Sequence, residues 1–268
     1  MTAPLTLDRD GPVAVITFNR PDKRNAISPE VACRLADAYA EARDDPAIRC
    51  VVLTGVGDRA FCSGGDLDRA LPLLSGARTP EDDWDRRFLD GDALTAETAL
   101  TDGYPKPVIA AVNGACLAGG MEILLGTDIR LSTPDATFAL PEAARGVIPF
   151  AGALARLPRQ IPHALAMEML LTGRPIDAET ALRAGLVGRI VPREGLMDAA
   201  LEVAHAIAAN APVALREIKR TVTAAAGRPL ADGFALEAAA RRTVMATEDA
   251  REGPRAFVER RAPVYRGR

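Results

Sequence analysis

The segment KPVIAAVNGACLAGGMEILLGTDIRLST, from Lys106 to Thr133, decides the fold class. Near its start lies a continuous apolar run, Val108–Val112, and near its end a second short run, Ile129–Leu131. Strands as apolar as these are usually covered on both faces, as the strands of parallel sheets are. The segment therefore predicts an α/β fold with mainly parallel or spiral-wound sheets.

The N-terminal part of the chain alternates strands and helices in the same way. Pro12–Phe18 (PVAVITF) has the β-branched alternation of a strand, and Cys50–Leu53 (CVVL) is another short apolar run. Between them, Ser28 matches an N-cap and Pro29 the first helical position. The helix that they predict has one apolar face, made by Val31, Leu35, Tyr39 and Ala42.

The segment from Leu71 to Gly103 departs from this alternation. It is rich in Asp, Glu, Arg, Thr and Gly, and helical periodicity is seen only from Trp84 to Leu100. Such an excursion from the core carries either binding surface or a solvated helical insertion, and the sequence leaves both open.

After Pro192 the sequence is almost wholly helical. Its Ala- and Leu-rich segments need a partner for their apolar stripes, either the chain's own core or a neighbouring subunit. The expected helices lie at Leu196–Ala209, Val213–Ala226, Leu230–Thr247 and Glu248–Arg261.

The charge of the chain argues against a surface for nucleic acid. The 268 residues carry a net charge of −3, with a pI near 5.6, whereas nucleic-acid-binding domains are usually basic. No cationic stretch followed by an apolar one opens the chain, and no run reaches the roughly 18–20 apolar residues of a membrane span. We therefore expect a soluble, cytoplasmic protein that does not associate with membranes.

Cysteine and histidine form no metal or nucleophile motif. The cysteines have no CxxC pair, and they fit buried small hydrophobic residues better than disulfides or zinc ligands. The histidines, His163 and His205, have no Ser or Cys nucleophile motif nearby. We therefore expect no metal site. The cysteines are Cys33, Cys50, Cys62 and Cys116.

Two glycine-containing turns follow predicted strands. One is AFCSGGDL, from Ala60 to Leu67, and the other is NGACLAGGME, from Asn113 to Glu122. In each, a strand is followed by small residues and a helix start, where backbone N–H groups are free to bind an anionic oxygen. If the turns face each other, they supply one N–H apiece to a carbonyl oxygen, as an oxyanion hole does. Paired glycines can also simply make tight turns, and the pattern alone favours that interpretation.

Two glutamates accompany the second turn. Glu122 lies in the otherwise apolar stretch MEILLG, and Glu142 follows in FALPE. A carboxylate in an apolar run costs free energy unless it is paired or has a chemical task. Two converging carboxyls suit general acid/base catalysis, although each could equally lie on a helix surface.

Taken together, these segments resemble the enoyl-CoA hydratase/isomerase (crotonase) family, and most of all its enoyl-CoA hydratases. The resemblance covers nearly the whole chain, and six motifs in order make it specific. They are NRPDKRNAIS (Asn19–Ser28), the AFCSGGDL turn, the Lys106–Thr133 segment, ATFALPEAARGVIP (Ala136–Pro149), AMEMLLTGRPIDAETALRAGLVGRIVP (Ala166–Pro192) and FVERRAP (Phe257–Pro263).

The resemblance implies a fold and an assembly. The fold is a crotonase-like α/β spiral of ββα units over residues 1–192, which holds the site for the acyl group and the coenzyme. Residues 193–268 form a C-terminal helical region for trimerisation. The assembly is a homotrimer or a hexamer made as a dimer of trimers.

The resemblance also implies a lyase of the hydro-lyase type, acting on acyl-CoA thioesters in fatty acid metabolism. It makes the N–H groups of Gly65 and Gly119 the oxyanion hole, and Glu122 and Glu142 the acid/base pair. Coenzyme A is part of the substrate, and no separate cofactor is implied. Coenzyme-binding positions are Lys23 and Arg24 at the phosphates, Asp66, Leu67 and Asp68 beside the pantetheine and adenine, and the C-terminal pair Phe257 and Arg260.

In the mechanism that the resemblance implies, Glu122 activates a water that adds at C3 of a 2-enoyl-CoA, and Glu142 delivers a proton to C2. Phe150 and Ala153 depart from the smaller or polar residues of many hydratases, which leaves the acyl group open. The alternatives are a Δ3,Δ2-enoyl-CoA isomerase, a specialised acyl-CoA lyase, or a non-catalytic RNA-binding relative. The pair of glutamates favours hydration over isomerisation.

Overall fold

The computed structural model describes residues 3–101 and 103–268, and its main sheet has six strands in the order β1-β2-β3-β5-β7-β10. From β2 onward each neighbouring pair is parallel, and β1 pairs with β2 antiparallel. The prediction of an α/β fold with mainly parallel sheets is confirmed. The strands are β1 (Leu5–Asp10), β2 (Val13–Phe18), β3 (Cys50–Gly55), β5 (Val108–Val112), β7 (Ile129–Ser132) and β10 (Arg189–Ile190).

A second sheet of four short strands, in the order β4-β6-β8-β9, carries the turns of the site. Its parallel pairs join β4 to β6 and β6 to β8, so that segments far apart in the sequence end at the same edge. Strands of two or three residues are too short to show a period, so the sequence pattern does not predict this sheet. They are β4 (Ala60–Cys62), β6 (Ala115–Leu117), β8 (Thr137–Ala139) and β9 (Ile176–Asp177).

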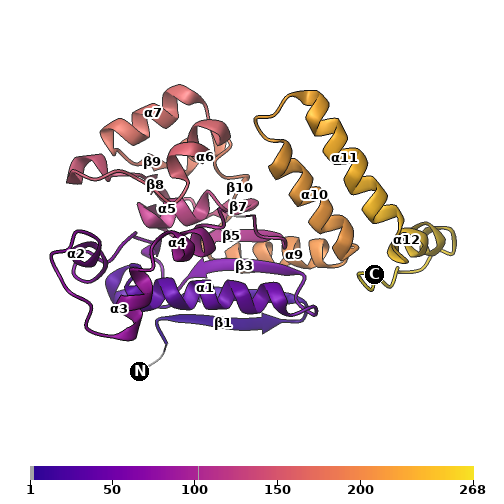
Figure 1. The fold of residues 1–268 in the computed structure, drawn as a ribbon, viewed down its shortest axis with the longest axis horizontal. Helices are drawn as coiled ribbons and strands as arrows, with labels where there is room; N and C mark the ends of the chain where they lie inside the picture. Colours follow the sequence, from indigo (N-terminus) through magenta and orange to yellow (C-terminus); the bar gives the residue numbers. More distant parts are fainter. Residues whose placement is uncertain (1–2, 102) are drawn as a thin grey trace.

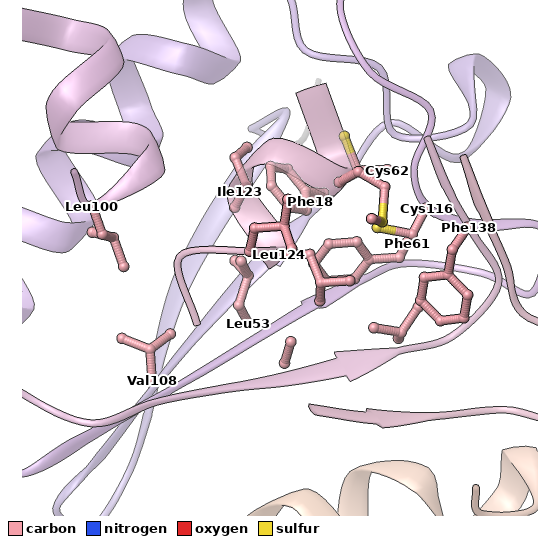
Figure 2. Packing of buried hydrophobic residues seen from close by; sticks show 14 of the residues in the cluster. Phe18, Leu53, Phe61, Cys62, Leu100, Val108, Cys116, Ile123, Leu124 and Phe138 are labelled. Atoms are coloured by element: carbon pink, nitrogen blue, oxygen red, sulfur yellow. The ribbon is translucent and has the colours of Figure 1, made fainter. Parts of the chain in front are cut away.

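Helix α1 (Pro29–Asp44) begins where the sequence predicts. The Ser28 hydroxyl accepts a hydrogen bond from the N–H of Val31 at 3.3 Å, which caps the first turn. Its predicted apolar face is fully buried against the core. Figure 2 shows part of that core, in which the rings of Phe18 and Phe61 meet edge to face with centroids 5.6 Å apart.

The segment Trp84–Leu100 does not form the one helix that the sequence predicts. It holds α3 (Asp83–Phe88) and α4 (Asp92–Ala99), which are separated at Gly91, whose φ is +68°. A left-handed backbone cannot continue a right-handed helix, so the chain turns there. A further short helix, α2 (Ala70–Leu74), precedes them, and both α3 and α4 pack against α1.

The remaining helices come after β6 in the chain, first between the strands of the two sheets and then as a C-terminal group. They are α5 (Gly119–Leu124), α6 (Ala153–Gln160), α7 (His163–Thr172) and α8 (Ala178–Arg183), with short 3₁₀ turns at Pro21–Lys23, Ala143–Arg145 and Arg193–Gly195. The C-terminal helices are α9 (Leu196–Ala208), α10 (Pro212–Ala225), α11 (Leu230–Met245) and α12 (Asp249–Val258), close to the four expected ranges.

Helix α9 covers the second face of the six-stranded sheet, where Leu196, Ala200 and Ala204 pack on β2, β3, β5 and β7. Helices α10 and α11 lie side by side, apart from α1–α8, and α12 follows α11 at the end of the pair where α10 leaves α9 (Figure 1). A short ion pair between Lys219 and Asp128, 2.7 Å, ties α10 to the core. The division at residue 192 stays a prediction, and residues 1, 2 and 102 of the expected spiral region lie outside the described ones. No helix within the described ranges is long and apolar enough to cross a bilayer.

Candidate active site

The two glycine-containing turns lie against each other. A Cβ atom on Gly64, whose φ is +92°, would lie 2.6 Å from the Cβ of Ala118 and 3.2 Å from the backbone N of Gly119. On the other side, a Cβ on Gly120 would lie 2.5 Å from the carbonyl oxygen of Cys62. The contacts of 2.6 and 2.5 Å are shorter than a side chain allows, so glycine is what lets the two turns approach.

The N–H groups of Gly65 and Gly119 are the free donors of these turns. Within the described residues neither donates a hydrogen bond to a backbone or side-chain acceptor. The backbone N of Gly65 lies 3.6 Å from the position that a Cβ on Gly119 would take, so the two residues are neighbours. Two free donors at one place are what a carbonyl oxygen that gains negative charge requires.

The two turns are not built alike. Gly119 is the first residue of α5, as expected, whereas the helix after Gly65 begins only at Ala70. Gly65 instead forms an isolated parallel bridge with Ile27, because the N–H of Ile27 donates to Gly64 and the carbonyl of Ile27 accepts from Asp66. The expected helix start is therefore wrong for the first turn, and bridging to Ile27 fixes Gly65 in its place.

Ala118, which precedes Gly119, has a strained backbone. Its φ of 50° and ψ of −123° belong to a region that residues with a Cβ seldom adopt. Such strain costs about 1–3 kcal/mol and persists only where the surroundings enforce it. Here the N–H of Ala118 donates to the carbonyl of Ala139 at 2.9 Å, which fixes the turn that aims the next N–H.

Glu122 lies one turn into α5, with its side chain 5% exposed. One carboxylate oxygen, Oε1, accepts a hydrogen bond of 2.6 Å from the backbone N–H of Phe150. Burial raises the pKa of Glu122 to about 7, with a smaller contribution from the charge of Glu142, while the Phe150 N–H acts in the opposite direction. The group can therefore change its protonation state near neutral pH.

Glu142 follows β8 after Leu140 and Pro141, and its side chain is 8% exposed. Its Oε2 atom is buried and has no hydrogen-bond partner among the described residues. Burial raises its pKa, and a hydrogen bond from its own backbone N–H and the charge of Arg145 partly offset the effect. A buried oxygen without a donor favours the protonated form of a carboxyl group.

One cavity of about 620 Å³ is lined by residues of both turns and by both carboxyls. Its size lies within the range of small-molecule sites. Gly65, Gly119, Glu122 and Glu142 all line it, together with apolar side chains of α2–α4 and of residues 146–151. The structure thus brings the four predicted catalytic residues to one place. Within residues 3–101 and 103–268, no three His, Cys, Asp or Glu side chains are grouped as ligands of a metal ion would be.

The predicted coenzyme-binding residues have different surroundings. Leu67 lines the cavity and is 60% exposed. Lys23 and Asp68 are exposed outside the cavity lining, where they form an ion pair of 3.3 Å. Asp66 is buried and bound to Arg20 at 2.8 Å, and it also accepts a hydrogen bond from the N–H of Asp68. Its carboxylate therefore stabilises the turn that carries Gly65.

Three further coenzyme positions lie away from the cavity lining. Arg24 ends the 3₁₀ turn Pro21–Lys23 in the left-handed conformation and is exposed. Phe257 is 85% exposed on α12, and Arg260 follows that helix. Helix α12 lies at the lower right of Figure 1, whereas α2 and α3 lie on the opposite side of the molecule. Their contact with a coenzyme stays a prediction.

Sequence reasoning missed three contributors to the site. They are the backbone N–H of Phe150, the strained backbone of Ala118, and Arg20, which binds the carboxylate of Asp66. A backbone donor leaves no mark in the residue types, because every residue except proline has one. Phe150 was notable only as a departure from the smaller residue of many hydratases.

Comparison with known proteins agrees with this geometry. The family model described as enoyl-CoA hydratase/isomerase matches residues 8–268. The enoyl-CoA hydratase EchA19 of Mycobacterium tuberculosis is 40% identical over 98% of this chain and 96% of its own. A carnitinyl-CoA dehydratase of Citrobacter koseri is 39% identical over the full length of both chains.

A solved structure gives the same result for the fold. The enoyl-CoA hydratase of Bacillus anthracis has a TM-score of 0.88 and 33% identity, covering 99% of this chain and 100% of its own. Family model, relatives and structure agree over essentially the whole length. The chain therefore belongs to the enoyl-CoA hydratase/isomerase (crotonase) family of enzymes, and it has the crotonase fold.

Proposed function

We propose that the chain is an enoyl-CoA hydratase, a hydro-lyase that adds water to a 2-enoyl-CoA to give a 3-hydroxyacyl-CoA. The observation that carries the proposal is the convergence of two buried carboxyls and two free backbone N–H groups in one cavity. The substrate is an acyl-CoA thioester, and coenzyme A enters as part of it.

The reaction begins at the thioester carbonyl. Its oxygen accepts hydrogen bonds from the N–H groups of Gly65 and Gly119, which withdraws electron density from C3 and stabilises the enolate that forms over C2 and C1. Loss of one such donor typically costs about 100–1000-fold in rate. The close approach of the two turns supports this assignment.

The carboxyls divide the proton transfers. We assign Glu122 as the base that takes a proton from water as its oxygen bonds to C3, because the Phe150 N–H acts against the burial that raises its pKa. The buried, unpartnered oxygen of Glu142 favours the protonated form, so Glu142 is the acid that gives a proton to C2. Glu122 ends protonated and Glu142 ionised, and proton exchange with water restores the pair.

Dehydration of a 3-hydroxyacyl-CoA is the same reaction in reverse. The names of the relatives include both a hydratase and a dehydratase, which supports a lyase and leaves the acyl group to be found. The second candidate is a Δ3,Δ2-enoyl-CoA isomerase. It is favoured if the 56% exposed side chain of Phe150, which lines the cavity, excludes water and leaves one glutamate as a proton shuttle.

Labelled water separates the two candidates. We expect 2-enoyl-CoA incubated with the enzyme in ¹⁸O-labelled water to give a 3-hydroxyacyl-CoA that carries the label at C3, as measured by mass spectrometry. Conversion of 3-enoyl-CoA to 2-enoyl-CoA without incorporation of label, across short, long and aromatic acyl groups, would overturn hydration in favour of isomerisation.

A further inference from the structure

Arg130, on β7, is a buried cation without a counter-ion among the described residues. It is 9% exposed, and the neighbouring carboxylate of Asp128 binds Lys219 and the N–H of Val108 instead. Burial lowers the pKa of Arg130 to about 10, so the guanidinium is still charged at neutral pH. A buried charge without an opposite one costs free energy, which indicates that this charge has a task.

The guanidinium of Arg130 binds the C-terminal end of α5. Its Nη2 atom donates to the carbonyls of Leu125 and Thr127, at 3.3 and 3.0 Å, and its Nε atom donates to the Thr127 hydroxyl at 3.2 Å. That hydroxyl donates in turn to the carbonyl of Leu124, the last residue of α5, at 2.7 Å. A further bond of 3.2 Å joins Nη1 to the carbonyl of Leu186. These bonds fix the guanidinium at the end of the helix.

The end of α4 meets the end of α5 at the same place. A Cβ on Gly126 would lie 2.5 Å from the carbonyl oxygen of Ala99, the last residue of α4. The last carbonyl groups of both helices therefore make this region negative. Arg156 on α6 binds the carbonyls of Ala99 and Leu100, at 2.6 and 2.8 Å, and so serves α4. Arg130 is the guanidinium that serves α5.

The opposite end of α5 carries the proposed catalytic groups. The helix begins at Gly119, whose N–H is free, and Glu122 lies one turn further on. A helix of six residues is about 9 Å long, which places the Arg130 charge roughly 12 Å from the Gly119 N–H. At an effective dielectric constant of about 20, a unit charge at that distance changes the rate of forming a negative charge about tenfold.

We propose that Arg130 is a positioning residue of the reaction, which holds α5 so that the Gly119 N–H stays aimed at the thioester carbonyl and whose charge stabilises the negative oxygen formed there. The inference rests on the hydratase function proposed above, in which that oxygen belongs to an enolate. Arg130 does not line the cavity, so it acts through the helix and not on the substrate. Its loss therefore lowers kcat and leaves binding of the thioester nearly unchanged.

The first test separates the charge from the hydrogen bonds. Arg130→Gln removes the charge and keeps an amide donor, and we expect kcat to fall about tenfold with a small change in KM. Arg130→Lys keeps the charge, and we expect it to recover most of kcat. The matched control is Lys106→Gln, because the Lys106 ammonium binds the carbonyls of Ala42 and Asp45 at the end of α1, 2.6 Å from each. That helix carries none of the proposed catalytic groups, so this variant should lose stability and keep kcat.

The second test measures the carbonyl directly. Butyryl-CoA has no double bond to hydrate, so it binds without reacting, and ¹³C at its thioester carbonyl makes that group visible in the infrared. Hydrogen bonds and nearby positive charge polarise a carbonyl and lower its stretching frequency. We expect wild type to lower the frequency relative to water, Arg130→Gln to reverse part of that shift, and Lys106→Gln to leave it unchanged.

The outcomes distinguish the inference from the proposed function. Wild-type kcat and an unaltered carbonyl frequency in folded Arg130→Gln overturn the inference. An equal loss of kcat in Arg130→Gln and Arg130→Lys, with the frequency unaltered, makes Arg130 a structural residue only and overturns it as well. If Arg130→Gln does not fold, a loss of about tenfold in kcat for Arg130→Lys overturns the role of the charge. A wild-type enzyme that hydrates no 2-enoyl-CoA overturns the proposed function instead.

Discussion

Glu122 and Glu142 are both buried in the cavity, but among the described residues only Glu122 accepts a hydrogen bond from another residue, and the Oε2 atom of Glu142 has no partner. Replacement by glutamine keeps the size of either side chain and removes its proton chemistry. We expect Glu122→Gln and Glu142→Gln each to lower kcat by about 100–10,000-fold with a small change in KM. Steady-state kinetics measure both constants. Near wild-type turnover by either variant, on every substrate that the enzyme accepts, excludes that residue from the chemistry.

Glu122 also makes the stability of the protein depend on pH. Its pKa is raised from 4.5 to about 7 by burial, so the folded state binds the proton more tightly than the unfolded state. Below pH 4.5 the carboxyl is protonated in both states, and the fold loses stability progressively as pH rises from about 4.5 through 7.

We therefore expect Glu122→Gln to stabilise the protein at pH 8, by on the order of 3 kcal/mol, and to have little effect on stability at pH 4. The glutamine oxygen can still accept the Phe150 N–H, so that hydrogen bond is retained. Guanidinium unfolding at the two pH values measures the difference. A variant whose stability relative to wild type is the same at both pH values shows that ionisation of Glu122 is not the cause.

At the scale of elements, an ion pair between Arg78 and Asp85 holds the segment from α2 to α3, whose first helix lines the cavity. Asp85 on α3 is fully buried and binds the Arg78 guanidinium through both oxygens, at 2.7 and 2.8 Å. It also accepts the N–H of Glu81 at 3.0 Å. These bonds connect α3 to the chain that follows α2, and the C-terminal end of α2, at Leu74 and Ser75, lines the cavity.

We expect Asp85→Asn to lower the free energy of unfolding by about 2 kcal/mol, because charged hydrogen bonds are lost in a buried place. It should also raise KM for the acyl-CoA substrate, since α2, which lines the cavity, is then held less firmly. The control is Asp83→Asn, which removes an exposed ion pair with Arg86 on the same helix and should change little. Equal effects of the two substitutions, in thermal unfolding and in KM, contradict a specific role for the buried pair.

The elements that the sequence predicts correctly are those with a local cause. Helix α1 has its cap in Ser28 and its period in the side chains that follow, and β5 is an uninterrupted apolar run. The break at Gly91 was missed because a single glycine also occurs within helices. The four catalytic candidates came from a family resemblance. Their proximity depends on parallel pairing of β4 with β6 and β6 with β8, which no local signal encodes.

At the scale of the whole molecule, α10–α12 present apolar side chains to solvent. Ile218, Val222, Phe234 and Met245 are each at least 60% exposed. We expect a homotrimer or a hexamer, in which a neighbouring subunit covers this surface. Light scattering at micromolar concentration measures the mass. A 28.3 kDa monomer that is fully active would contradict the assembly.

The hydrogen-bond donors that we propose for the thioester carbonyl and for Glu122 are main-chain groups: the N–H of Gly65, of Gly119 and of Phe150. A main-chain donor survives any change of side chain that keeps the backbone path and does not introduce proline. Mutation at position 150 can therefore change the shape of the cavity while Glu122 keeps its hydrogen bond. The side chain that lines the cavity at position 150 can thus be varied in the laboratory independently of the hydrogen bond that holds Glu122.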